Sequence, residues 1–314
     1  MSSYIDLRLE GPDASLTARI GVRGAQLKSL QRNNVEFIQQ HADLPEVPWA
    51  AGLVMAPWVN RIDAGQWTQN GVSYSLPITD TVFGNAIHGL VMFEDFEVLA
   101  QTESAVRLGR TIKPIDGYPF ELDFRVEYHL QPDGLAVRHI AVNHSAEPAP
   151  FATGAHPYLV LGDEPIDRAT IRVAARTYVA SDERMLPVSR EFTDRSPFDL
   201  TGGVVIDNLR IDTTYGNLKR DDAGMASASI IGLDLGLELW QDSKFTHTHV
   251  FVTPDFSGPN GKCLAVAIEP TTGPANNFNG YATVAAFIVL RYRDLARGKP
   301  IGEAVQMSRK RLRL

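Results

Sequence analysis

The chain has 314 residues, of which 44% are hydrophobic and 21% charged, and a chain of this length and composition can bury a large apolar core. Its formal net charge of −7 argues against a nucleic-acid partner. The single cysteine excludes an internal disulfide, and the sequence shows neither a signal-peptide pattern nor a run approaching the roughly 18 apolar residues of a membrane span, so we expect a cytoplasmic protein without a membrane partner.

Short segments in which apolar and polar residues alternate recur along the chain and predict β-strands. In chain order they are SYIDLRLE (3–10), ARIGVRG (18–24), FRVEYHL (124–130), LAVRHIAVNH (135–144), TIRVAARTYVA (170–180) and GLDLGLELWQD (232–242).

Turn signals separate these strands, and helical signals are few. The clearest hairpin is HLQPDGLAVRH, in which Pro132, Asp133 and Gly134 form the turn. Asn70-Gly71 predicts a second turn, and residues 43–52 and 164–170 have room for one helical turn each. Many short strands with regular turns favour an all-β fold, a large antiparallel sandwich or barrel, and we expect residues 1–314 to form one domain.

Four stretches interrupt this pattern with polar residues that a plain sandwich does not need. They are APWVNRIDAGQW with Arg61, GNAIHGL with Asn85 and His88, TGAHPYLVL with His156, and AVAIEPTTGPANNFNGY with Glu269. Each has a purely structural alternative. Arg61 could form a surface ion pair, the two histidines could be satisfied core residues, and Glu269 could be an exposed strand end.

Taken together, a carboxylate and an imidazole can act as base and acid near neutral pH. This pair suits the ring opening of a sugar hemiacetal, in which the C1 hydroxyl loses a proton while the ring oxygen gains one. No nucleotide-binding or nucleophile motif accompanies the four stretches. The THTH segment places His247 and His249 on one face of a strand, which we interpret as an outward strand face because no third ligand stands at metal-site spacing. We expect neither metal nor cofactor.

The same stretches, in this order, resemble the aldose 1-epimerase (mutarotase) family over most of the chain. The markers are NRI, NAIHG, GAHPYL, IDTTY, HVFVTPD and IEPTTGPANNFN, of which the last is the most specific. The resemblance implies the galactose mutarotase-like β-sandwich and a mutarotase that interconverts the α and β anomers of an aldose.

The resemblance also implies roles for individual residues. Glu269 corresponds to the base and His156 to the acid. His88 corresponds to the histidine near the reacting centre, and Arg61 and Asp212 to the residues that bind sugar hydroxyls. Asn85, in the NAIHG segment, is a further candidate for substrate binding. The segment around His156 reads Ala-His-Pro-Tyr-Leu, which departs from the galactose mutarotase branch and is closer to a divergent bacterial branch.

Several alternatives remain open at this point. The substrate could be a hexose such as glucose or galactose, or a hexose 6-phosphate. The chain could instead be a non-catalytic carbohydrate-binding protein, which would use aromatic residues for stacking, or a glycoside hydrolase with two acting carboxylates. The aromatic candidates for stacking are Trp58, Trp67, Trp240 and Phe278. We expect a small-molecule sugar as the partner and a monomer or homodimer.

Overall fold

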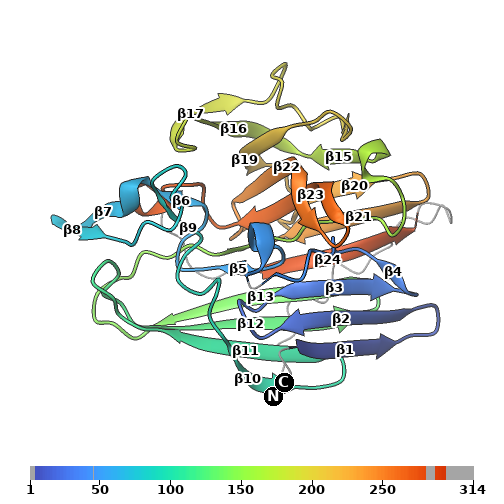
Figure 1. The fold of residues 1–314 in the computed structure, drawn as a ribbon, viewed down its shortest axis with the longest axis horizontal. Coiled ribbons are helices and arrows are strands. Elements are labelled where there is room, and N and C mark those ends of the chain that lie inside the picture. The colour runs from blue at the N-terminus through green and yellow to red at the C-terminus, as the bar shows by residue number, and fades with distance from the viewer. Residues whose placement is uncertain (1–3, 45, 281–286, 295–314) are drawn as a thin grey trace.

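The computed structural model describes residues 4–44, 46–280 and 287–294, and two large antiparallel sheets dominate them (Figure 1). The nine-stranded sheet contains, in spatial order, β10 (Glu97–Gln101), β11 (Ala105–Ile112), β12 (Leu122–Gln131), β13 (Gly134–Asn143), β24 (Phe287–Asp294), β21 (Leu235–Gln241), β20 (Ala226–Ile231), β15 (Thr170–Val173) and β18 (Val204–Val205). The seven-stranded sheet contains β17 (Pro187–Phe192), β16 (Ala175–Ser181), β19 (Ile211–Leu218), β22 (His247–Gly258), β23 (Gly261–Thr271), β14 (Gly154–Ala155) and β5 (Val54–Met55).

Smaller elements complete the described part of the chain. A four-stranded sheet packs against β11 and β12 and comprises β1 (Tyr4–Glu10), β2 (Ser15–Gly21), β3 (Leu27–Arg32) and β4 (Val35–Glu36). Two short ladders pair β6 (Arg61–Ile62) with β9 (Ala86–Ile87) and β7 (Gln66–Gln69) with β8 (Val72–Ser75). The helical elements within these residues are single 3₁₀ turns: η1 (Pro48–Ala50), η2 (Asp63–Gly65), η3 (Ile166–Arg168) and η4 (Asn277–Asn279). The expected all-β antiparallel sandwich is confirmed.

Local turn chemistry explains the hairpins. The β12–β13 ladder closes on the pair Gln131 and Gly134, so Pro132 and Asp133 form the turn as predicted. In the β7–β8 hairpin, Asn70 and Gly71 have φ values of 52° and 79°, which this tight turn requires at both central positions. The two predicted helical turns correspond to η1 and η3.

One predicted strand divides into two. The segment TIRVAARTYVA forms β15 up to Val173 and β16 from Ala175, and these strands belong to different sheets. Alternation continues through the break, so the sequence pattern could not reveal it. The chain therefore passes from one layer of the sandwich to the other at Ala174.

The main core contains apolar side chains from both large sheets. On β22 and β23 these are Val250, Val252, Val266 and Ile268, all of them buried. Successive side chains of a strand point to opposite faces. Their neighbours on the same strands, among them His249 and Glu269, therefore lie on the other face of the seven-stranded sheet.

Other expectations from the sequence concern the C-terminal segment, the membrane and the state of the protein in the cell. The basic C-terminal segment MSRKRLRL, which its charge predicts to be a solvated tail or a final strand edge rather than a nucleic-acid or membrane contact, lies outside the described residues. No helix among the residues that the structure describes is long and apolar enough to span a membrane. The single-domain organisation, the cytoplasmic location and the oligomeric state stay predictions.

Candidate active site

Glu269 lies inside a strand rather than at its end. β23 continues through Pro270 to Thr271, and Glu269 pairs across the ladder with His249 of β22. Glu269 is only 2% exposed, so the interpretation of Glu269 as an exposed strand end is wrong. Apolar neighbours on the strand face the core, which turns the carboxylate toward the opposite face of the sheet.

His156 approaches Glu269 from the neighbouring strand. β14 joins β23 through the pair Gly154 and Thr271, and His156 follows β14 directly. The His156 backbone is fixed on both sides, because its N–H donates to Leu53 O and its carbonyl accepts from Gly52 N. As a result His156 Nε2 lies 3.4 Å from Glu269 Oε1, with both side chains buried.

His88 joins this pair from the loop after β9. Its ring centroid lies 5.5 Å from that of His156, with the two planes nearly perpendicular. The backbone of His88 is left-handed, with φ of 61°, and Gly89 follows with φ of 84°. A Cβ at Gly89 would lie 2.0 Å from Ala56 O, so only glycine allows this close approach. The NAIHG motif thus fits a turn that aims His88 at His156.

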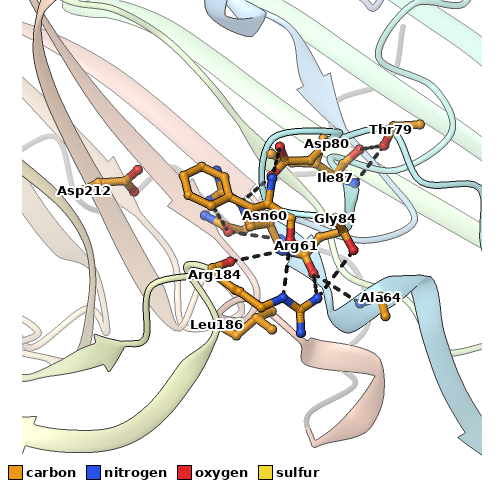
Figure 2. A network of polar contacts seen from close by, with 12 residues as sticks. Asn60, Arg61, Ala64, Thr79, Asp80, Gly84, Ile87, Arg184, Leu186 and Asp212 are labelled. Carbon is orange, nitrogen blue, oxygen red and sulfur yellow. Dashed lines mark hydrogen bonds and ion pairs between the residues drawn. The ribbon is translucent and has the colours of Figure 1, made fainter.

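Arg61 is held in place by its neighbours (Figure 2). Its Nε donates to Asp80 Oδ2 at 2.7 Å, and its Nη1 donates to Asn60 Oδ1 at 3.3 Å. The guanidinium carbon lies 4.9 Å from the ring centroid of Phe83. The two partners of the ion pair are nearly buried, with side-chain exposures of 11% and 10%, so Arg61 is not the exposed surface pair of the alternative interpretation.

Asn85 serves the protein's own backbone and a second arginine. Its Oδ1 accepts from Ala64 N and from Arg184 Nη2, and its Nδ2 donates to Arg184 O. Arg184, in the turn between β16 and β17, also forms an ion pair with Asp63 at 2.8 Å. Figure 2 shows Arg184 reaching across to Gly84, whose carbonyl accepts from Arg184 Nη2 at 3.4 Å. Substrate binding by Asn85 stays a prediction, while its contacts show that it ties two distant loops together.

Asp212 and His249 form a second acid–imidazole pair on the same sheet face. His249 Nε2 lies 2.8 Å from Asp212 Oδ1, and His249 Nδ1 lies 2.8 Å from Thr214 Oγ1. No dashed line joins Asp212 to the other residues drawn in Figure 2. The predicted outward position of His249 on its strand is wrong, because this histidine is 6% exposed and its ring contacts Asp212.

The other histidine of THTH lies elsewhere. His247 Nδ1 contacts Thr246 Oγ1, and its ring packs against Gly216. Burial lowers the pKa of His247 to about 4. No group of three or more histidine, cysteine or acidic side chains within the described ranges could hold a metal ion.

Burial and charge set the protonation of the site residues. Burial lowers the pKa of His156 despite the nearby Glu269, and it lowers the pKa of His88 well below the ordinary value. Burial would also lower the pKa of His249, but the charges of Glu269 and Asp212 outweigh it and raise that pKa. For Asp212, burial acts to raise the pKa, and contact with His249 together with the charge of Arg61 lowers it overall.

Buried polar atoms without protein partners gather at this place. His156 Nδ1, His88 Nδ1 and Tyr158 Oη have no hydrogen-bond partner among the described residues. The Tyr158 ring stacks on His156 at 5.1 Å between centroids. Native proteins rarely leave buried polar atoms unpaired, and such atoms call for an explanation, for example a catalytic role or a bound water or ion.

Three of the aromatic residues considered for sugar stacking belong to the core instead. Trp58 and Trp67 are 1% and 2% exposed, and Phe278 packs edge-on against both. Because they are buried in the core, they cannot present a ring face to a sugar. A binding protein that relied on them for stacking is therefore not supported.

The chain as a whole is similar to known proteins. The family model described as aldose 1-epimerase matches residues 7–283. The uncharacterized protein YihR of Escherichia coli (strain K12) is 29% identical over 264 residues, which cover 83% of this chain and 82% of YihR.

Solved structures share the fold at low sequence identity. A GalM/aldose epimerase homologue from C. elegans superimposes with a TM-score of 0.79 and 15% identity, covering 93% of this chain and 99% of that one. A galactose 1-epimerase from Lactobacillus acidophilus NCFM has a TM-score of 0.75 and 16% identity, covering 93% and 98%.

Proposed function

This chain belongs to the aldose 1-epimerase family, and on that premise we propose that it is a mutarotase that interconverts the α and β anomers of an aldose. The observation that carries the proposal is the buried contact of 3.4 Å between His156 Nε2 and Glu269 Oε1. The reacting oxygens of a sugar hemiacetal, O1 and the ring oxygen, are both bonded to C1. An acid and a base that serve them must therefore lie close together, as these two groups do.

In the proposed reaction Glu269 acts as base and His156 as acid. Glu269 takes the proton from the C1 hydroxyl, the C1–O1 bond becomes a carbonyl, and the bond from C1 to the ring oxygen breaks. His156 gives its proton to that oxygen. Rotation about the C1–C2 bond and the reverse proton transfers close the ring in the other anomer and restore both residues. Burial lowers the pKa of His156, which makes its imidazolium a stronger acid but leaves a smaller fraction of it protonated at neutral pH, so we expect the reaction to be fastest on the acid side of neutrality.

Asp212, Arg61 and His88 are proposed to hold the sugar. Asp212 lies on the same sheet face as Glu269, with a side chain that is 31% exposed. Arg61 keeps a fixed orientation through Asp80, so it can donate to a hydroxyl without a large loss of conformational entropy. His88 lies edge-on to His156 and retains an unpartnered buried nitrogen for the substrate near C1. Asn85 is proposed to support this group through the loop that carries His88.

The test is a direct measurement of anomer exchange. Freshly dissolved α-D-glucose and α-D-galactose, and the 6-phosphates of both sugars, are followed by polarimetry or NMR with and without the purified protein. We expect at least one of these four sugars to reach anomeric equilibrium faster with the wild type than with the Glu269→Gln variant. If none equilibrates faster than in buffer while calorimetry shows that a sugar binds, the chain is a carbohydrate-binding protein. Release of new reducing ends from an oligosaccharide would indicate a hydrolase instead.

A further inference from the structure

His249 differs from the other two histidines of the site in its contacts. Both of its ring nitrogens are engaged, Nε2 by Asp212 Oδ1 and Nδ1 by Thr214 Oγ1, each at 2.8 Å. His88 and His156 each have an Nδ1 atom without a partner among the described residues. An imidazole with both nitrogens engaged, one of them by a carboxylate, is fixed in orientation. It suits a supporting role better than direct proton exchange with a substrate.

The strand register places His249 between two carboxylates. It pairs directly with Glu269 on β23, and on its other side it pairs with Thr214 of β19, two residues from Asp212. Directly opposed residues on neighbouring antiparallel strands have Cβ atoms about 4.5–5.5 Å apart. Two acidic side chains of the proposed mechanism therefore lie on either side of one imidazole.

The surrounding charges favour a protonated His249. Asp212 on β19 and Glu269 on β23 are the acidic groups that act on it, and Arg61 on β6 opposes them. The guanidinium of Arg61 is already paired with Asp80. His156, which follows β14, and His88, which follows β9, face the same site, and burial lowers the pKa of both. In the sugar-free site, a proton is therefore held more readily by His249 than by His156 or His88.

We propose that His249 is a positioning residue that, as an imidazolium, orients the Asp212 carboxylate toward the sugar and offsets the repulsion between Asp212 and Glu269. This role rests on the proposed mutarotase function. With Oδ1 of Asp212 held by the imidazolium, the second carboxylate oxygen is presented to a sugar hydroxyl. The positive charge also stabilises two neighbouring carboxylates that would otherwise disfavour each other's ionisation.

Two substitutions separate orientation from charge. His249→Ala removes both, and we expect KM for the better of α-D-glucose and α-D-galactose to rise about 10- to 100-fold, the equivalent of a lost charge-assisted hydrogen bond. His249→Gln keeps a neutral donor for Asp212, so KM recovers most of that loss. In both variants the acid limb of the kcat/KM profile moves to higher pH, because the carboxylates lose their positive neighbour.

His247→Gln is the matched control, since His247 lies on the same strand and is also buried, but contacts neither carboxylate. It should change neither KM nor the position of the acid limb. A His249→Gln variant with the wild-type acid limb would overturn the charge role, and wild-type KM in His249→Ala would overturn the orienting role. The same shift of the acid limb in His247→Gln would show that the effect is a general one of strand packing.

A second measurement does not depend on turnover. NMR titration of ¹⁵N-labelled histidines in the sugar-free protein follows each ring, with the His249 signals assigned by their loss in His249→Gln. We expect His249 to stay protonated above pH 6.5 and His247 to titrate near 4. An Asp212→Asn variant should lower the midpoint of His249. A His249 that is neutral at pH 6.5 in the wild type would overturn the inference, whether or not the protein acts on the sugars tested.

Discussion

His156 Nε2 and Glu269 Oε1 lie 3.4 Å apart although β14, which ends directly before His156, shares a single ladder pair with β23, Gly154 with Thr271. The contact is therefore set by this pair, by the bridge between Tyr158 and Ala267 that follows, and by the two backbone hydrogen bonds that tie His156 to the loop at Gly52 and Leu53. A proton can leave a substrate toward one member of this pair while another arrives from the other member. The first two predictions follow from this geometry.

Replacing Glu269 by Gln should keep the shape of the site and remove the base. A positioned general base contributes about 10²–10⁴-fold to a rate, so the anomerisation rate should fall by that amount. Polarimetry with the best sugar measures the loss. Glu97→Gln, at an exposed position on β10, is the matched control and should behave as wild type. A Glu269→Gln variant within about threefold of the wild-type rate would assign the base to another residue.

The proposed acid should show itself in the pH profile. Burial lowers the pKa of His156, so its protonated form is lost as pH rises through a value below the ordinary 6.5. We expect the kcat/KM of the wild type to fall along this limb, and His156→Asn to be slower and to lack it. The profile is measured by NMR exchange between pH 4 and 9. A variant that retains the wild-type limb would transfer the acid role to His88.

Arg61 is expected to bind sugar hydroxyls. Losing a hydrogen bond from a charged group costs about 1.5–3 kcal/mol, so Arg61→Ala should raise KM by roughly one to two decades. Arg61→Lys should not restore it, because an ammonium cannot keep the contacts with Asp80 and Phe83 in the same geometry. Asp80→Asn should raise KM to a smaller extent by loosening Arg61. Steady-state kinetics of the three variants measure KM and kcat. Unchanged KM and kcat in Arg61→Ala would place Arg61 outside the site.

Acid should destabilise the protein through a buried histidine that takes no part in the proposed proton transfers. His139 is buried beside Phe124 and Phe245, and burial lowers its pKa to about 3. In the unfolded chain the same group protonates near pH 6.5, so the unfolded state binds more protons between these values and stability falls as pH falls through 6.5. At pH 5 this amounts to about 2 kcal/mol relative to pH 7.

Urea unfolding of wild type and His139→Gln at pH 7 and pH 5 measures that difference. His139→Gln should lose less stability between the two pH values, because an uncharged amide does not titrate. Equal losses in wild type and His139→Gln would show that other groups carry the acid sensitivity.

Activity should not depend on a metal ion. The proposed proton transfers need only a carboxylate and an imidazole, and His249 is engaged by Asp212 and Thr214. Protein dialysed against a strong chelator should anomerise its best sugar at the undialysed rate. If activity is lost and a single divalent ion restores it, the mechanism requires Lewis-acid assistance at the sugar oxygens.

The sequence predicts the features of this protein that depend on short stretches of chain. The alternation of apolar and polar residues predicts β1, β12, β13 and β21. Turn chemistry alone predicts the hairpin at residues 132–134. The role of His249 could not be recognised in the same way. Alternation places His247 and His249 on one strand face, but only the pairing of β22 with β19 and β23 shows that His249 meets two carboxylates.

The close approach of His156 to Glu269 likewise depends on a long-range register that no local pattern encodes. Residue chemistry suggested an acid–base pair, and the family resemblance assigned its two roles to Glu269 and His156. The contacts of Asn85 were also not predictable. Its place in NAIHG predicts a substrate ligand. In the structure its side-chain amide forms hydrogen bonds with Arg184, which belongs to a turn that the sequence offers no reason to place nearby.

The position of β24 has a consequence for how the chain folds. This late strand lies in the middle of the nine-stranded sheet, between β13 and β21. Until residues 287–294 are available, the sheet exists as two halves whose facing strands expose unpaired backbone groups. Such edges recruit other chains, so the nascent protein is prone to aggregate until β24 has been synthesised, and closure of the sheet must wait for contacts between distant parts of the sequence.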